Sequence, residues 1–125
     1  MIEKRIKVFL ADDHKITRTA LKNIFSTASD MEVVGEAANA EEFFEEIQKT
    51  KPDAIVLDLN MPEIDGLEIL KRLRSEGNNT PVVILTLFPP ERLKEASLAA
   101  GATNFLSKDC DPEELIETVR RSISA

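Results

Sequence analysis

Short apolar runs alternate with amphipathic stretches five times along the chain. The runs are Ile6–Ala11, Met31–Ala37, Ala54–Leu59, Val82–Leu87 and Thr103–Leu106. Three of them contain continuously apolar segments (VFLA, AIVL and VVIL), which are typical of strands that helices cover on both faces. The run at 31–37 alternates more and contains a glycine, so it predicts a strand nearer the edge of a sheet.

The stretches between these runs carry apolar residues at the spacing of a helix face, as at Ile16, Ala20 and Ile24. Capping-box spacing, with a side-chain acceptor before the helix and a carboxylate three residues later, occurs at Asn39 with Glu42, Asp65 with Glu68 and Asp111 with Glu114. Pro112 fits the first position of the last helix, where a missing N–H costs nothing. Gly77 and Gly101 come just after predicted helices, where left-handed backbone is common.

This alternation of strands and helices predicts one α/β domain over residues 1–125, with no output domain. A parallel sheet with helices on both faces follows from the repeated strand–helix unit. Five such units favour the doubly wound, flavodoxin-like (βα)5 fold with strand order 2-1-3-4-5. A ligand site in such a sheet lies beyond the carboxyl ends of the strands.

The charge balance of the chain excludes some classes of binding partner. The chain has 125 residues, 16 Lys+Arg and 23 Asp+Glu, for a net charge of −7. An acidic surface repels phosphate groups, so we expect no direct nucleic-acid binding by this domain and no docking on anionic membranes. Cys110 is the only cysteine, and the first apolar run is too short for a signal peptide, which together predict a cytoplasmic protein.

Polar and charged residues stand where the predicted strands end. Asp12 and Asp13 follow the first strand, and Asp58, Thr86 and Lys108 end the third, fourth and fifth. Three neighbouring carboxylates need compensation, which Mg²⁺ and a lysine can supply. The same groups suit a phosphoryl group, with Asp58 as the nucleophile, Asp12 and Asp13 as metal ligands, and Thr86 as a hydrogen-bond donor.

At these positions the chain resembles the receiver domain of bacterial two-component response regulators. The resemblance covers essentially all of the chain. It rests on the DD pair at 12–13, LDLNMPEIDG at 57–66, VVILT ending at Thr86, and GATNFLSK at 101–108. Within the family, ADDH, EVVGEAANAEE and GATNFLSKD are most similar to receivers joined to a C-terminal helix-turn-helix DNA-binding domain.

The resemblance implies a phosphorylation-activated switch. Asp58 would accept a phosphoryl group from a histidine kinase, a phosphotransfer protein or a small phosphodonor. Asp12 or Asp13, Asp58 and the backbone carbonyl of Asn60 would hold Mg²⁺, and Lys108 would contact the phosphate. Thr86 and Phe105 would then move and change the surface formed by the fourth helix, fifth strand and fifth helix, so as to control an output, transcription in this branch. A phosphorylation-dependent homodimer is compatible with this scheme.

Four positions stay open or depart from the family pattern. Asp109 stands where many receivers have a proline with a cis bond, and a cis bond without proline costs ~3–4 kcal/mol. Phe88, two residues after the switch threonine, predicts slow autodephosphorylation by shielding the acyl phosphate from water. Phe105 is either a core residue or the mobile aromatic of the family. His14, the only histidine, is interpreted as a solvated first-turn residue that lacks partners for a metal site or a Ser/His/Asp triad.

Three other functions compete with the switch. An aspartate-nucleophile phosphatase would need a second carboxylate two residues after Asp58, where Asn60 stands. A flavin-binding module would need a hydroxyl- and glycine-rich loop after the first strand, where ADDHKIT stands. A receiver-like interaction domain without phosphorylation would not need the complete set of site residues. We therefore expect no enzyme activity beyond the promotion of its own phosphorylation and dephosphorylation.

Overall fold

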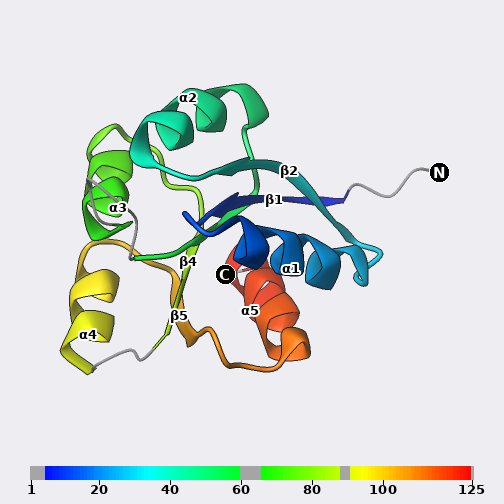
Figure 1. The fold of residues 1–125 in the computed structure, drawn as a ribbon. Helices are drawn as coiled ribbons and strands as arrows, with labels where there is room; N and C mark the ends of the chain where they lie inside the picture. Colours follow the sequence, from blue (N-terminus) through cyan, green and yellow to red (C-terminus); the bar gives the residue numbers. More distant parts are fainter. Residues whose placement is uncertain (1–4, 60–65, 88–90, 125) are drawn as a thin grey trace.

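A computed structural model describes residues 5–59, 66–87 and 91–124 of the chain (Figure 1). Strands and helices alternate throughout this part. The strands are β1 (Ile6–Ala11), β2 (Met31–Ala37), β3 (Ala54–Leu57), β4 (Val82–Thr86) and β5 (Asn104–Ser107). The helices are α1 (Lys15–Ser26), α2 (Ala40–Thr50), α3 (Gly66–Ser75), α4 (Glu91–Ala99) and α5 (Pro112–Ser124).

The five described strands form one parallel sheet in the order β2-β1-β3-β4-β5. The predicted doubly wound α/β fold and its strand order are therefore confirmed. The glycine-containing strand β2 lies at one edge, as its alternating pattern predicts. No described helix has the length and apolarity needed to cross a membrane.

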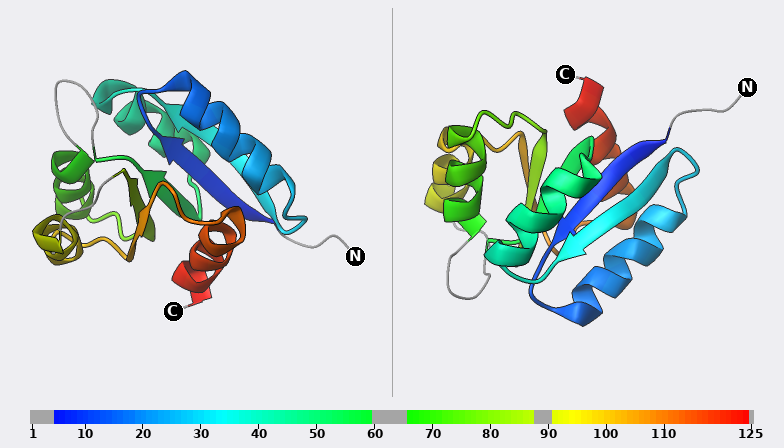
Figure 2. Two further views of the ribbon diagram at one scale, coloured as in Figure 1. Left: turned by 60° about the horizontal axis from the view of Figure 1, so that its bottom comes forward. Right: turned by 90° about the horizontal axis from the view of Figure 1, so that it is seen from above.

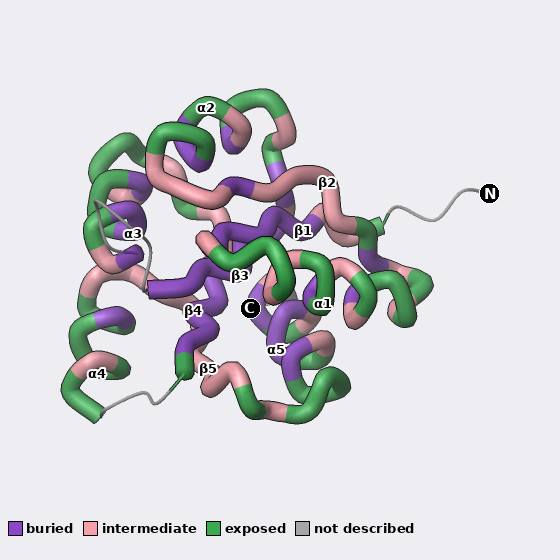
Figure 3. The backbone as a smooth tube through the Cα atoms, viewed as in Figure 1, coloured by how far each residue is buried: buried purple, intermediate pink, exposed green. Residues whose placement is uncertain are grey.

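Helices cover both faces of the sheet (Figure 2). On one face, Phe9 of β1 packs in a core with Phe43 of α2 and Leu70 of α3. On the other face, Val8 of β1 packs in a core with Phe25 of α1 and α5 residues such as Val119. Neighbouring residues of β1 thus enter opposite cores, which explains why the central strands are buried along their length (Figure 3).

The predicted helix signals are largely confirmed. Asn39 Oδ1 accepts a 2.9 Å hydrogen bond from the Glu42 N–H, and the Glu42 carboxylate accepts one from Ala38. The Glu114 N–H donates instead to the backbone carbonyl of Asp111. Pro112 begins α5. Gly77 and Gly101 have positive φ angles of 83° and 108°. Asp65 lies outside the described residues.

Candidate functional site

The carboxyl end of the sheet brings the predicted site residues to one rim. Asp12 and Asp13 follow β1, Asp58 follows β3, Thr86 ends β4 and Lys108 follows β5. The strand pairing continues into the site, because the Asp58 N–H donates to the Ala11 carbonyl at 2.9 Å and the Lys108 N–H to the Thr86 carbonyl at 2.7 Å. The backbone of the sheet therefore fixes where these side chains start.

Two of the aspartates are buried and share one lysine. Asp12 and Asp58 are 1% and 2% exposed. Lys108 Nζ lies 2.9 Å from Asp12 Oδ2 and 3.1 Å from Asp58 Oδ2. Burial by itself lowers the pKa of Lys108, but the hydrogen bond to Asp12 and the charge of Asp58 outweigh it, so this pKa lies above its usual value. The lysine is charged and compensates part of the negative charge at the rim.

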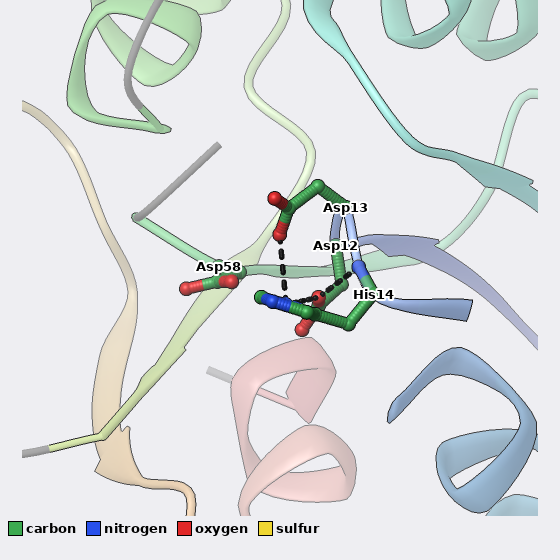
Figure 4. A group of neighbouring side chains, drawn as sticks. All are labelled: Asp12, Asp13, His14 and Asp58. Carbon is green, nitrogen blue, oxygen red and sulfur yellow. Dashed lines mark hydrogen bonds and ion pairs between the residues drawn. The ribbon is translucent and has the colours of Figure 1, made fainter. Parts of the chain in front are cut away.

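Carboxylate charge remains for a cation. Ligand atoms of Asp12, Asp13, His14 and Asp58 all lie within 4.8 Å of one another (Figure 4). Asp13 Oδ1 is buried and accepts no hydrogen bond of good geometry from the described residues, although His14 Nδ1 lies 2.9 Å from it. A buried, unsatisfied carboxylate oxygen beside two further carboxylates is the donor set that Mg²⁺ prefers. The residues present therefore fit the predicted metal.

His14 lies close to Asp12 and Asp13, which the sequence did not predict. Its side chain is 65% exposed, as predicted, but Nδ1 lies 2.9 Å from Asp13 Oδ1 and 3.3 Å from Asp12 Oδ1. The prediction that it lacks partners for a metal site is wrong, because its ring and the three aspartates form one cluster that could hold a metal ion. His14 is the N-cap of α1 rather than a first-turn residue, and this position turns its ring back toward the two aspartates.

Thr86 and Phe105 take different positions at the other side of the rim. Thr86 is buried, with 2% of its surface exposed. Phe105 pairs in register with Ile84 of β4, is half-buried, and packs at the margin of the core shared with α2 and α3. The switch roles of both residues stay predictions.

Gly66 places the start of α3 against the backbone of Asp58 and Leu59. Its N–H donates to the Leu59 carbonyl at 2.8 Å. A Cβ atom at position 66 would lie 2.3 Å from the Asp58 carbonyl oxygen and 2.6 Å from Leu59 Cα. Only glycine allows this close approach. The contact with the Asp58 backbone therefore explains why a glycine begins α3.

Some predictions concern residues that the structure does not describe. Asn60 and Phe88 lie outside the described ranges, so the carbonyl ligand and the shielding ring stay predictions. Lys108–Asp109 lies inside them, and the described part of the chain contains no cis peptide bond. The chain therefore leaves Lys108 through a trans bond, without the proline of many receivers.

Sequence reasoning missed Arg18, which is next to the site. Its Nη1 donates to the Asp12 carbonyl oxygen and its Nε to Glu36 Oε1 of β2, both at 2.7 Å. The side chain is only 13% exposed. A role for an arginine near the start of the helix after Asp12-Asp13 could have been suspected, but its backbone partner leaves no mark in the sequence.

The strand order and the lysine that joins two buried aspartates define the class as a receiver domain. Residues 8–120 match the response regulator receiver domain family, and the chain belongs to that family. It is 40% identical over 113 residues to the uncharacterized transcriptional regulatory protein YhcZ of Bacillus subtilis, covering 90% of this chain and 53% of YhcZ. It is 38% identical over 115 residues to the nitrate/nitrite response regulator protein NarL of Escherichia coli, covering 92% of this chain and 53% of NarL.

Solved structures agree with this assignment. The response regulator domain of Thermotoga maritima CheB superposes with a TM-score of 0.90 at 29% identity, covering 98% of each chain. A two-component response regulator of the LuxR family from Aurantimonas superposes with a TM-score of 0.91 at 27% identity, covering 97% of this chain and 86% of that one. The chain spans about half the length of the curated relatives it matches. These relatives are transcriptional regulators, and the receiver family is not an enzyme family.

Proposed function

We propose that this receiver domain accepts a phosphoryl group on Asp58 and thereby switches an output, which is transcription if the whole protein works as its relatives do. One observation carries the proposal. Lys108 Nζ contacts Asp12 and Asp58 at 2.9 and 3.1 Å, inside a rim where both carboxylates are buried. Burying two carboxylates that share one ammonium is costly for stability, which favours a functional reason for them.

The chemistry assigns one task to each side chain. An Asp58 oxygen attacks the phosphorus, the O–P bond forms, and the bond from phosphorus to the donor breaks, with the leaving group keeping the electron pair. Lys108 stabilises the charge on the transferred oxygens, and the Thr86 hydroxyl donates to one of them. When bound by Asp12, Asp13, Asp58 and the Asn60 carbonyl, Mg²⁺ supplies the remaining charge compensation. Subsequent hydrolysis of the acyl phosphate returns the carboxylate, so the domain promotes only its own phosphorylation and dephosphorylation.

The phosphodonor that we propose is a histidine kinase or phosphotransfer protein docking over α1 beside the rim. An apolar groove runs along this face, lined by residues that include Ile16, Leu21 and Leu87. Ile16 is 86% exposed and Leu87 is 50% exposed. Apolar side chains exposed next to a reactive rim suit a protein partner that delivers a phosphohistidine.

The output side of the proposal concerns α4, β5 and α5. Phosphate on Asp58 would favour one of two conformations of this surface through Thr86 and Phe105. A homodimer formed on phosphorylation would be one consequence. The acidic domain itself would bind neither nucleic acid nor membrane, and its place of action would be the cytoplasm.

Acetyl phosphate tests this proposal without a kinase. Wild type, Asp58→Asn and the matched control Asp53→Asn, which changes an aspartate before the same strand, are incubated with acetyl phosphate with and without Mg²⁺. Intact mass is measured together with light scattering for the oligomeric state. We expect one phosphoryl group on wild type and on Asp53→Asn, only with Mg²⁺, and none on Asp58→Asn. Wild type that gains no phosphoryl group in any condition contradicts the proposal.

A further inference from the structure

Arg18 joins three parts of the fold just beneath the acidic cluster. Its backbone N–H donates to the His14 carbonyl at 3.0 Å, within the first turn of α1. Its guanidinium donates to the Asp12 carbonyl and to Glu36 of β2, both at 2.7 Å. The backbone bond is the ordinary helical one, so the guanidinium alone ties the loop at 12–14 to the edge strand β2.

The backbone of Asp12 is consequently fixed on both sides. Its N–H donates to the Ala37 carbonyl of β2 at 3.1 Å. Its carbonyl accepts from Arg18, which is itself anchored on Glu36 of the same strand. This carbonyl belongs to the peptide group that leads into Asp13, so its orientation helps to fix where the Asp13 side chain leaves the backbone. Without the Arg18 side chain, the carbonyl of buried Asp12 loses its charged donor and the loop gains freedom.

The charge of Arg18 is compensated away from the cluster. Glu36 accepts from Arg18 Nε and from Lys22 Nζ, both at 2.7 Å. The hydrogen bond from Lys22, and then that from Arg18, hold the pKa of the Glu36 carboxyl below its usual value. An ionised Glu36 offsets part of the positive charge of Arg18 and Lys22 and so reduces the repulsion of a cation bound nearby.

We propose that Arg18 is a positioning residue for divalent-cation binding, acting through the Asp12 backbone on the Asp12 and Asp13 carboxylates. This inference rests on the proposed function, because it assigns Arg18 to the same site. Arg18 would not contact the transferred phosphoryl group itself. Groups that orient metal ligands commonly change metal affinity by about 10- to 100-fold when removed.

Whether replacing Arg18 weakens or strengthens Mg²⁺ binding distinguishes a positioning role from a purely electrostatic one. Removal of a nearby positive charge by itself strengthens cation binding, whereas loss of ligand orientation weakens it. A purely structural role would lower the folded fraction and leave the Mg²⁺ affinity of the folded molecules unchanged. The matched control is Lys22→Ala, which removes another cation bonded to Glu36 at 2.7 Å but leaves the Asp12 carbonyl untouched.

The experiment measures Mg²⁺ dissociation constants of the full chain by amide chemical shifts, which also report folding. We expect Arg18→Ala and Arg18→Gln to weaken Mg²⁺ binding by on the order of 10-fold or more. Arg18→Lys should recover part of the affinity. Lys22→Ala should stay within about twofold, since half-exposed ion pairs contribute little. Mg²⁺ binding that is unchanged or tighter in folded Arg18→Ala overturns the inference.

Phosphorylation by acetyl phosphate provides the second readout. Arg18→Ala should raise the half-saturating Mg²⁺ concentration and regain the wild-type maximal rate at excess Mg²⁺. A lowered maximal rate with an unchanged half-saturating concentration contradicts positioning. Wild type that binds Mg²⁺ but takes up no phosphoryl group contradicts the proposed function alone, and the Mg²⁺ constants still decide the role of Arg18. Wild type that binds no Mg²⁺ overturns both.

Discussion

Lys108→Met leaves two buried carboxylates without their shared ammonium. In the wild type, Lys108 Nζ contacts Asp12 at 2.9 Å and Asp58 at 3.1 Å, and its side chain is 13% exposed. Removing one partner of a buried ion pair costs about 3–5 kcal/mol of stability. Because the rim is open to water beside Asp13, we expect the lower end, about 3 kcal/mol in the absence of divalent cation.

Mg²⁺ should reverse much of this loss. A cation that binds only the folded chain adds about 2.7 kcal/mol at 100 times its dissociation constant. Loss of the lysine also removes a charge that repels the cation, so Lys108→Met should bind Mg²⁺ more tightly than wild type. The stability difference between the two proteins should therefore shrink as Mg²⁺ is added.

Urea unfolding in EDTA and across a Mg²⁺ series measures both effects. The control is Lys71→Met, because Lys71 is 55% exposed and 3.8 Å from Glu68, and its loss should change stability by less than about 0.5 kcal/mol. The double variant Lys108→Met with Asp58→Asn removes one of the two buried negative charges and should regain stability. If Lys108→Met is as stable as wild type in EDTA, or if Mg²⁺ restores nothing, the reasoning is refuted.

Three further predictions follow from the rim. Gly66→Ala places a Cβ 2.3 Å from the Asp58 carbonyl, so thermal unfolding should show a loss of at least about 1–3 kcal/mol, and an unchanged midpoint would contradict this contact. Asp13→Asn relieves charge repulsion, so it should gain about 1 kcal/mol in EDTA while calorimetry shows weaker Mg²⁺ binding; a loss of stability would count against it. The raised pKa of Lys108 means that its contribution is complete below the unfolded value of 10.5 and is lost as pH rises through the folded value. Unfolding free energies above pH 10.5 should fall faster for wild type than for Lys108→Met, and parallel curves would disprove this.

The sheet could be predicted because its central strands are buried on both faces. Continuous apolar segments at 8–11, 54–57 and 82–85 are typical of strands that are covered by helices on both faces of such a sheet. The ends of the strands were less certain. β3 ends at Leu57 rather than Leu59, because its described pairing with β4 stops there, and β5 runs from Asn104 to Ser107 rather than from Thr103 to Leu106.

The candidate site could be predicted as far as it is made by strand ends. Asp12, Asp58, Thr86 and Lys108 come together because parallel strands deliver their last residues to one rim. The contacts of His14 could not be predicted, because they depend on how the N-terminus of α1 lies over the rim.

Arg18 was missed for a different reason. It lies on a helix, and one of its partners is a backbone carbonyl that any amino acid would provide. Hydrogen bonds of this kind have no residue-type signature, so only the folded structure reveals them.

Identification of the phosphorylated residue tests the central claim most directly. Wild type is treated with acetyl phosphate and Mg²⁺, the acyl phosphate is reduced with borohydride, and peptides are sequenced by mass spectrometry. An aspartyl phosphate is converted to homoserine by this treatment. The account predicts homoserine at position 58 and no conversion when Mg²⁺ is withheld. Conversion at Asp12, Asp13 or another carboxylate, or none at all, would contradict it.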